Sequence, residues 1–282
     1  MSKIKEYFFL FKVHHWIKNL SIFLPVIASH SYLNLSTVAC LMHFINFSIL
    51  ASIIYLINNI SDYKADIINK KLRYKLNLDR KKYYYYLSTL AIIIQIILLY
   101  VFSRDVLIIC LFYVLLSITY NQFLKNHKYF DVLTISIFHI LRIYYGAVVF
   151  EITLSFYFIL FCFSIFLMIG LNKRIIEIQK NFTNRPYNLN DKKRLNFLQV
   201  LFGILAVLTF LFYCIDPLTS QYFLNQSFLY LNSILIILII GNYLYFQRNM
   251  NQDIIVFIYK NKINLVLVSS FFIIFIKNSA FF

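Results

Sequence analysis

The sequence predicts an all-α membrane protein with nine transmembrane helices, and two observations support that class. Hydrophobic residues make up 61% of the 282 residues and charged residues only 13%, whereas an ordinary soluble domain has about 25% charged residues. The apolar residues also form runs of about 20, the length that an α-helix needs to cross the hydrocarbon core. We therefore expect one transmembrane domain over residues 1–282.

The expected elements follow one another with short separations. Residues 1–18 alternate lysines with aromatic residues, which is typical of an amphipathic helix lying at the membrane interface. The first two spans are divided only by a short turn, and Pro25 can interrupt the first of them. A strongly basic stretch precedes the third span, which enters the aromatic belt at Tyr83–Tyr86. The nine spans are expected near residues 19–35, 36–60, 82–103, 105–124, 130–150, 153–172, 195–215, 227–247 and 262–281.

Lysine and arginine distribution sets the expected orientation, because cytoplasmic loops carry these residues in excess. With a cytoplasmic N-terminus, all of the 27 basic residues except Arg104, Arg142 and Lys277 fall in cytoplasmic segments. The sequence thus predicts an integral protein of a bacterial-type inner membrane, with its C-terminus outside. The net charge of +16 gathers on one face, which suits lipid headgroups and phosphorylated substrates. Its dispersal among helix ends disfavours nucleic acid as a partner.

Polar residues gather at the cytoplasmic ends of these spans, which predicts one polar cavity facing the cytosol. Asp62 and Asp66 are four residues apart, so a continuous helix stacks their carboxylates on one face. Magnesium prefers such oxygen ligands and completes its shell with water and substrate phosphates. Alternatively, both aspartates pair with Lys70 or Arg73 in a solvated loop. The basic residues of that loop either grip phosphates or merely follow the positive-inside rule.

Several short motifs in this order resemble one known family. Asn58-Asn59-x-x-Asp62-x-x-x-Asp66 resembles the NDxxDxxxD signature of the UbiA superfamily of intramembrane prenyltransferases, with Asn59 at the place of its first aspartate. The remaining likeness is to the decaprenyl-phosphate phosphoribosyltransferase branch of that superfamily. It comprises His14-His15-Trp16-Ile17-Lys18-Asn19 (HQWxKN), Tyr120 to Lys125 (YxxxLK), Asp131, Arg142 with Gly146-Ala147, and Lys173-Arg174-Ile175-Ile176-Glu177 (KRxxE).

This resemblance implies a UbiA-like bundle of nine helices and a specific reaction. The implied enzyme is a magnesium-dependent polyprenyl-phosphate phosphoribosyltransferase of the cell envelope, which moves 5-phosphoribose from phosphoribosyl diphosphate to a polyprenyl phosphate and releases diphosphate. The main catalytic demand is stabilisation of the leaving diphosphate by magnesium and cationic side chains. A strong base is unnecessary, because the acceptor phosphate is already ionised at neutral pH.

The resemblance also implies roles for individual residues. Asp62 and Asp66, with Asn59, are expected to hold magnesium, and Lys173, Arg174 and Glu177 to organise the donor as catalytic residues. Arg142 lies too deep in its span to be a loop charge, so it needs a buried partner or a substrate phosphate. The residues expected to bind substrates are Lys18, Asn58, Asn59, Arg73, Tyr120, Lys125, Asp131 and Arg142.

Two other functions stay open. One is a conventional UbiA prenyltransferase, which moves a prenyl chain from its diphosphate to an aromatic or other acceptor. The sequence opposes it, because no second DxxxD motif follows the sixth span. The other is a non-catalytic relative or lipid transporter, which the loss of the first aspartate at Asn59 would permit.

Overall fold

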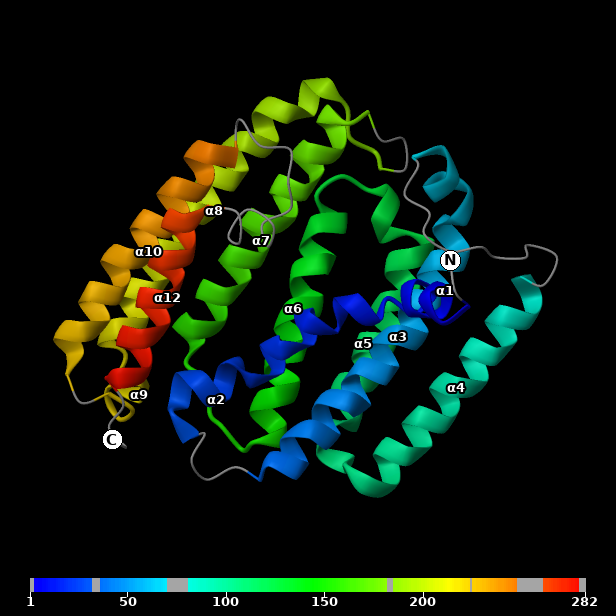
Figure 1. Cartoon of the computed structure of the whole chain (residues 1–282), viewed down its shortest axis with the longest axis horizontal. Helices are drawn as coiled ribbons and strands as arrows, with labels where there is room; N and C mark the ends of the chain where they lie inside the picture. Colours follow the sequence, from blue (N-terminus) through cyan, green and yellow to red (C-terminus); the bar gives the residue numbers. More distant parts are fainter. Residues whose placement is uncertain are drawn as a thin grey trace.

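Long apolar sequences form long helices that lie side by side in one bundle (Figure 1). The computed structural model describes residues 3–31, 36–69, 81–181, 185–223, 225–247 and 261–278. The long helices are α3 (Thr37–Ile68), α4 (Lys81–Phe102), α5 (Leu107–Gln122), α6 (Phe130–Val149), α7 (Phe156–Gln179), α8 (Lys192–Ile215), α10 (Gln226–Gln247) and α12 (Lys262–Lys277). The short elements are α1 (Lys3–Leu10), η1 (Val13–Phe23), α2 (Leu24–Ser29), η4 (Arg104–Val106), η5 (Leu124–Asn126), η6 (Leu189–Asp191) and α9 (Pro217–Ser220).

Long helices that follow one another along the chain pack side by side, from α3 through to α12 (Figure 1). Phe47, Tyr113 and Tyr145 belong to a core cluster among α3 to α6. Phe158 and Phe210 belong to a second cluster among α7 to α12. Large apolar side chains on the outer faces of the helices are exposed, as expected where the surrounding medium is lipid and not water.

Among the described residues, seven helices are long and apolar enough to cross a membrane: α3, α4, α5, α6, α7, α8 and α10. The all-α membrane class is therefore confirmed, whereas the count of nine spans is not. The first expected span is divided between η1 and α2, and Pro25 lies in the first turn of α2, where its missing N–H costs no helical hydrogen bond. The last expected span corresponds to α12, which has 16 residues.

The 3₁₀ helix η1 lies between α3 and α6, and polar side chains fix it there. Trp16 Nε1 donates to Ser52 Oγ at 2.8 Å, and Asn19 Nδ2 donates to Ser48 Oγ at 3.0 Å. On α6, a Cβ atom at Gly146 would lie 1.8 Å from the carbonyl oxygen of Ile22. Glycine is therefore required at position 146 for the two backbones to approach so closely.

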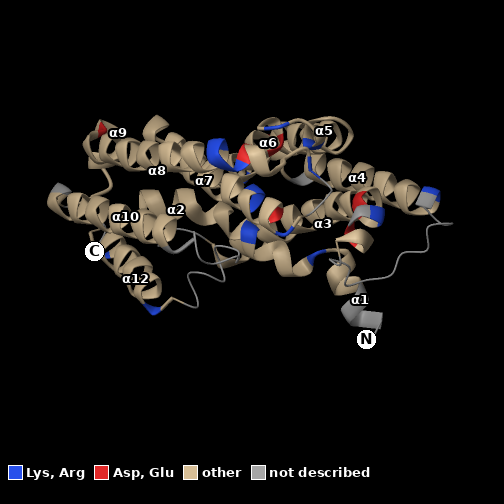
Figure 2. Ribbon diagram, turned by 90° about the horizontal axis from the view of Figure 1, so that it is seen from above, with Lys and Arg blue, Asp and Glu red and all other residues tan. Residues whose placement is uncertain are grey.

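Charged side chains concentrate at one end of the bundle, which we call the charged end. It comprises the C-terminal ends of α3, α5 and α7 and the N-terminal ends of α4, α6 and α8. Seen from above, the Lys, Arg, Asp and Glu positions gather where α3, α6 and α7 end or begin, while long stretches of α8 and α10 carry neither colour (Figure 2). These features make the chain an integral membrane protein with one strongly polar end.

Candidate active site

A polar cavity of about 160 Å³ opens between η1, α3, α5, α6 and α7. Most of the charges on its wall are positive, and Asp62 supplies the negative charge among its lining residues. The lining residues are Lys12, Lys18, Ile54, Tyr55, Asn58, Asp62, Tyr113, Ser117, Tyr120, Ile135, Phe138, His139, Arg142, Lys173 and Arg185. This excess of cations on one concave wall creates a site suited to an anionic ligand.

The rotation of α3 decides which polar residues reach this cavity. Asn58 and Asp62 line it, one helical turn apart, and the same spacing places Asp66 on that face one turn further on. Asn59 points elsewhere: it is 1% exposed, and its Nδ2 donates to the carbonyl oxygen of Leu10 at 2.7 Å. The structure thus presents Asn58, and not the expected ligand Asn59, beside the aspartates.

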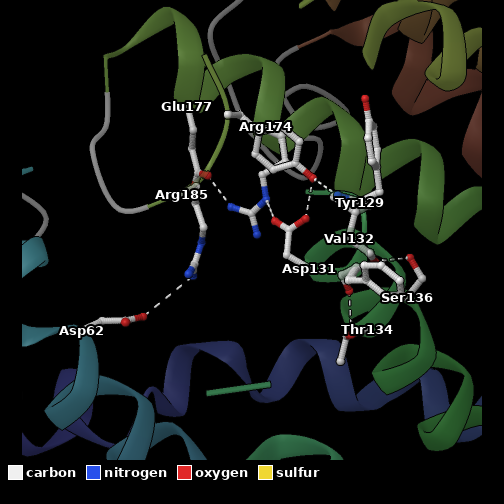
Figure 3. Close-up of polar contacts among 11 residues, drawn as sticks. Asp62, Tyr129, Asp131, Val132, Thr134, Ser136, Arg174, Glu177 and Arg185 are labelled. Atoms are coloured by element: carbon white, nitrogen blue, oxygen red, sulfur yellow. Dashed lines mark hydrogen bonds and ion pairs between the residues drawn. The ribbon is translucent and has the colours of Figure 1, made fainter. Parts of the chain in front are cut away.

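Two cations share the carboxylate of Asp62. Lys125 Nζ lies 2.8 Å from Oδ1 and also donates to Ser61 Oγ at 2.8 Å. Arg185 Nη2 lies 3.8 Å from Oδ2 (Figure 3). Lys125 was expected from the sequence to contact substrate, and the structure brings it to the proposed metal ligand. Arg185 was not expected from the sequence, because a single arginine in a basic loop resembles any other residue that obeys the positive-inside rule.

A buried ionic network lies beside the cavity and joins α6 to α7 (Figure 3). Arg174 Nε is 2.6 Å from Asp131 Oδ2, and its Nη1 pairs with Glu177. The side chains of Arg174 and Asp131 are 1% and 0% exposed. Tyr187 donates its hydroxyl to Asp131, and burial together with this bond raises the pKa of Tyr187. Asp131, Arg174 and Glu177 were expected from the sequence to contact substrate. In the structure these three side chains pair with one another.

Lys173 differs from its neighbour Arg174 in facing the cavity, where its side chain is exposed. Successive residues of an α-helix point about 100° apart, so only one member of this pair can face the same space. Lys173 consequently stands with Lys12 and Lys18 on the cavity wall. Of the five residues that the sequence predicted as catalytic, the structure thus places Lys173 and Asp62 on the cavity wall.

Arg142 lies at the inner part of the site, 3% exposed. Its partners are neutral: Nε donates to Asn19 Oδ1 at 3.0 Å, Nη2 to Tyr113 Oη at 2.9 Å, and Nη2 also to Tyr55 Oη at 3.4 Å. No carboxylate of the described residues forms an ion pair with it. Since a buried guanidinium without a counter-ion is costly, its charge is available to an anionic ligand.

Lys12, which precedes η1, lines the cavity and was not among the site residues expected from the sequence. Lys12 Nζ lies 5.4 Å from the centre of the Tyr55 ring, and burial lowers the pKa of Lys12, an effect that Tyr55, Asp66 and Asp62 oppose. Burial and nearby cations lower the pKa of His15 to about 2, so this imidazole is neutral at physiological pH. Lys18 and Tyr120, both expected from the sequence, line the cavity. Arg73 lies outside the described residues.

An apolar cavity of about 250 Å³ adjoins the polar one and is lined from α2, α7, α8, α10 and α12. Phe166 lines the apolar cavity and His139 lines the polar one. Their rings stack with centroids 4.3 Å apart and planes inclined by 12°. The two stacked rings therefore separate the apolar cavity from the cationic one. Such a pair of cavities suits a ligand that has a charged head group and a hydrocarbon chain.

A magnesium ion fits the donor set on α3. Asn58 Oδ1 is buried and has no hydrogen-bond partner among the described residues, and it lines the cavity with Asp62. Such a neutral oxygen beside carboxylates suits magnesium, which takes a few protein oxygens and keeps several waters. Within the described ranges, no three His, Cys, Asp or Glu side chains cluster tightly enough to hold a metal unaided. Substrate oxygens would therefore have to complete the shell.

Comparison with solved structures identifies the fold. A structure of digeranylgeranylglyceryl phosphate synthase superposes with a TM-score of 0.66 at 18% identity, over 99% of each chain. A UbiA homologue from Archaeoglobus fulgidus bound to DMAPP and Mg²⁺ gives a TM-score of 0.70 at 12% identity, over 97% of each chain. The same organism's homologue bound to Cd²⁺ gives 0.67 at 11% identity, over 96% of this chain and 98% of the other. These likenesses confirm a UbiA-like fold.

Sequence comparison adds less. No family model matches the chain. An uncharacterised protein of Sinorhizobium fredii, y4nM, is 25% identical over 244 residues, which cover 80% of this chain and 46% of y4nM. The chain therefore spans about half the length of this relative.

Proposed function

We propose that this protein is a magnesium-dependent membrane transferase of the UbiA type that uses an anionic diphosphate donor and a lipid acceptor. More specifically, it transfers 5-phosphoribose from phosphoribosyl diphosphate to a polyprenyl phosphate. The observation that carries the proposal is the cationic cavity, whose wall combines Lys12, Lys18, Lys173 and Arg142 with the magnesium-type oxygens of α3. The Archaeoglobus fulgidus homologue, whose structure holds DMAPP and Mg²⁺, supports it by sharing the fold.

The cavity binds the donor through the donor's negative charge. Phosphoribosyl diphosphate carries several negative charges, and the lysines of the wall attract it and hold its diphosphate. Asp62, Asp66 and Asn58 would hold magnesium, which when bound supplies positive charge to the leaving diphosphate. Lys173 adds a cation on the same wall, and negative charge that develops on the diphosphate as the C1–O bond breaks is stabilised there.

The acceptor uses the boundary between the two cavities. Its phosphate oxygen is already ionised, so the site needs to orient it and not to deprotonate it. Arg142 is suited to hold this phosphate, because its guanidinium bonds to neutral groups of the described residues and to no carboxylate among them. The hydrocarbon chain would lie in the apolar cavity beyond the stacked rings of His139 and Phe166. We place this polar end in the cytosol, where the soluble donor is found, with the N-terminus inside and the C-terminus outside.

A second candidate is conventional prenyl transfer, which the apolar cavity and the DMAPP-bound homologue also favour. One assay separates the two. Purified protein is incubated with magnesium, labelled phosphoribosyl diphosphate and polyprenyl phosphate, and in parallel with labelled prenyl diphosphate and aromatic acceptors. We expect magnesium-dependent label in the lipid fraction only with the first pair, and none with Asp62→Asn. Label transfer only from prenyl diphosphate would favour the second candidate, and transfer from neither would contradict both.

A further inference from the structure

We infer that Arg185, and not Arg174, is the arginine that contacts the donor diphosphate, and that Tyr187 and Asp131 form an anchor that positions it. This inference rests on the proposed function, and it adds a ligand-binding residue and two positioning residues. It also gives the KRxxE segment a different task from the one that its sequence suggests, because Arg174 then supports the site from behind the cavity wall.

Arg185 has the placement that a phosphate-binding residue needs. It lines the polar cavity and its side chain is 13% exposed. Its Nη2 is 3.8 Å from Asp62 Oδ2, and its guanidinium carbon lies 6.0 Å from the centre of the Tyr120 ring. Its Nε is buried and has no hydrogen-bond partner among the described residues. Buried donors are nearly always paired, so an anion in this cavity would satisfy a group that the protein leaves unpaired.

The loose contact with Asp62 supports the same role. Lys125 approaches Asp62 at 2.8 Å, whereas Arg185 stays at 3.8 Å, beyond good hydrogen-bonding distance. Arg185 therefore has N–H groups left to bind a diphosphate while its charge stays near the metal ligand. A guanidinium offers two parallel N–H groups to phosphate oxygens, an arrangement that a lysine ammonium cannot reproduce.

The anchor lies two residues away along the chain. Tyr187 donates its hydroxyl to Asp131 on α6, and the same oxygen accepts the backbone N–H of Tyr129 at 2.7 Å. Asp131 is in turn held by Arg174. Figure 3 shows Arg185 extending from this region towards Asp62 on α3, while Arg174 points to Asp131. The anchor thus fixes the backbone next to Arg185 and lets its side chain reach across to α3.

Arg174 is poorly placed to exchange these contacts for a ligand. Its side chain is 1% exposed, and both of its acidic partners are also nearly buried. Contact with a diphosphate would require Arg174 to leave two carboxylates, and both of these buried charges would then lose the cation that they share. Arg185 has to give up only a distant contact with Asp62.

The test measures binding of inorganic diphosphate with Mg²⁺ to the purified full chain by calorimetry, together with donor and acceptor KM values. We expect Arg185→Gln to weaken diphosphate binding at least tenfold and to raise the donor KM without changing the acceptor KM. Arg185→Lys should recover only part of the loss. Tyr187→Phe, which removes a single hydroxyl, should weaken binding several-fold and also raise only the donor KM. Arg194→Gln is the matched control, because Arg194 is exposed and lines a different groove, so binding should be unchanged.

The outcomes separate this inference from the proposed function. If the wild-type protein binds no magnesium diphosphate, both are overturned. If the wild type binds it and Arg185→Gln binds equally well, the inference alone fails. If Arg185→Gln and Arg194→Gln weaken binding to the same extent, the effect is only one of net charge, and the specific contact is refuted. If Tyr187→Phe raises the donor and acceptor KM values together, its positioning role is refuted.

Discussion

Replacement of Asp131 by Asn should cost stability, because it leaves Arg174 with one charged partner in place of two. The side chains of Arg174 and Asp131 are 1% and 0% exposed, and the two atoms that join them are 2.6 Å apart. Loss of one member of such a buried pair costs about 3–5 kcal/mol, since the remaining charge stays out of water. This corresponds to a change of roughly 10² to 10⁴ in the unfolding equilibrium. Asp62→Asn is the matched comparison: Asp62 is 23% exposed on a cavity wall, so about 1–2 kcal/mol is expected.

Denaturant titration in detergent can measure this difference. Trp16 is the only tryptophan, and its indole bonds to Ser52 on α3, so its fluorescence reports on the packing of η1. We expect Asp131→Asn to unfold at clearly lower denaturant concentration than Asp62→Asn. Asp62→Asn should instead lose transferase activity while it keeps most of its stability. An Asp131→Asn protein within about 0.5 kcal/mol of wild type would refute the structural role of this pair.

Three further predictions concern single residues. Asn59→Asp should lower the free energy of unfolding by about 1–3 kcal/mol, because a carboxylate would face the carbonyl of Leu10 in place of an amide N–H; equilibrium denaturation checks this, and a stabilised variant would contradict it. Lys125→Met should lower the Mg²⁺ concentration for half-saturation by several-fold, since an ammonium no longer competes for Asp62; Mg²⁺ titration in the presence of inorganic diphosphate measures it, and an unchanged midpoint would exclude the competition. Between pH 7 and pH 5 the wild-type Tm should fall partly through His15, whose pKa is lowered from 6.5 to about 2, because only the unfolded chain takes up this proton. His15→Gln should reduce that fall, and an identical pH dependence in both proteins would show that His15 contributes nothing.

The helical class and the polar end could be predicted from the sequence because both depend on local composition. Runs of apolar residues fix where helices form, and the i,i+4 spacing of Asp62 and Asp66 fixes that they share a face. The first span was harder. Its residues are apolar enough to suggest a full crossing, but η1 keeps Trp16 and Asn19 bonded to α3, a tertiary contact that hydropathy does not report.

The site was only partly predictable, because the rotation of each helix depends on its neighbours. The sequence does not distinguish the adjacent asparagines Asn58 and Asn59. Asn59 is turned away from the cavity because its side chain donates to the carbonyl oxygen of Leu10. Lys173 and Arg174 are separated in the same way by Asp131 on α6. Arg185 carries no local signature, since its significance comes from reaching a carboxylate far away in the sequence.

The seating of η1 has a consequence for how the protein is made. Asn19 bonds to Ser48 on α3 and to Arg142 on α6, and both partners are synthesised after η1. A short 3₁₀ helix with a tryptophan, an asparagine and a lysine is a poor candidate for insertion into lipid by itself. During biogenesis, η1 can therefore reach its final position only after α6 has left the ribosome. The bond between Asn19 and Arg142 can form only after α6 has been made, so the polar interior is completed late in assembly.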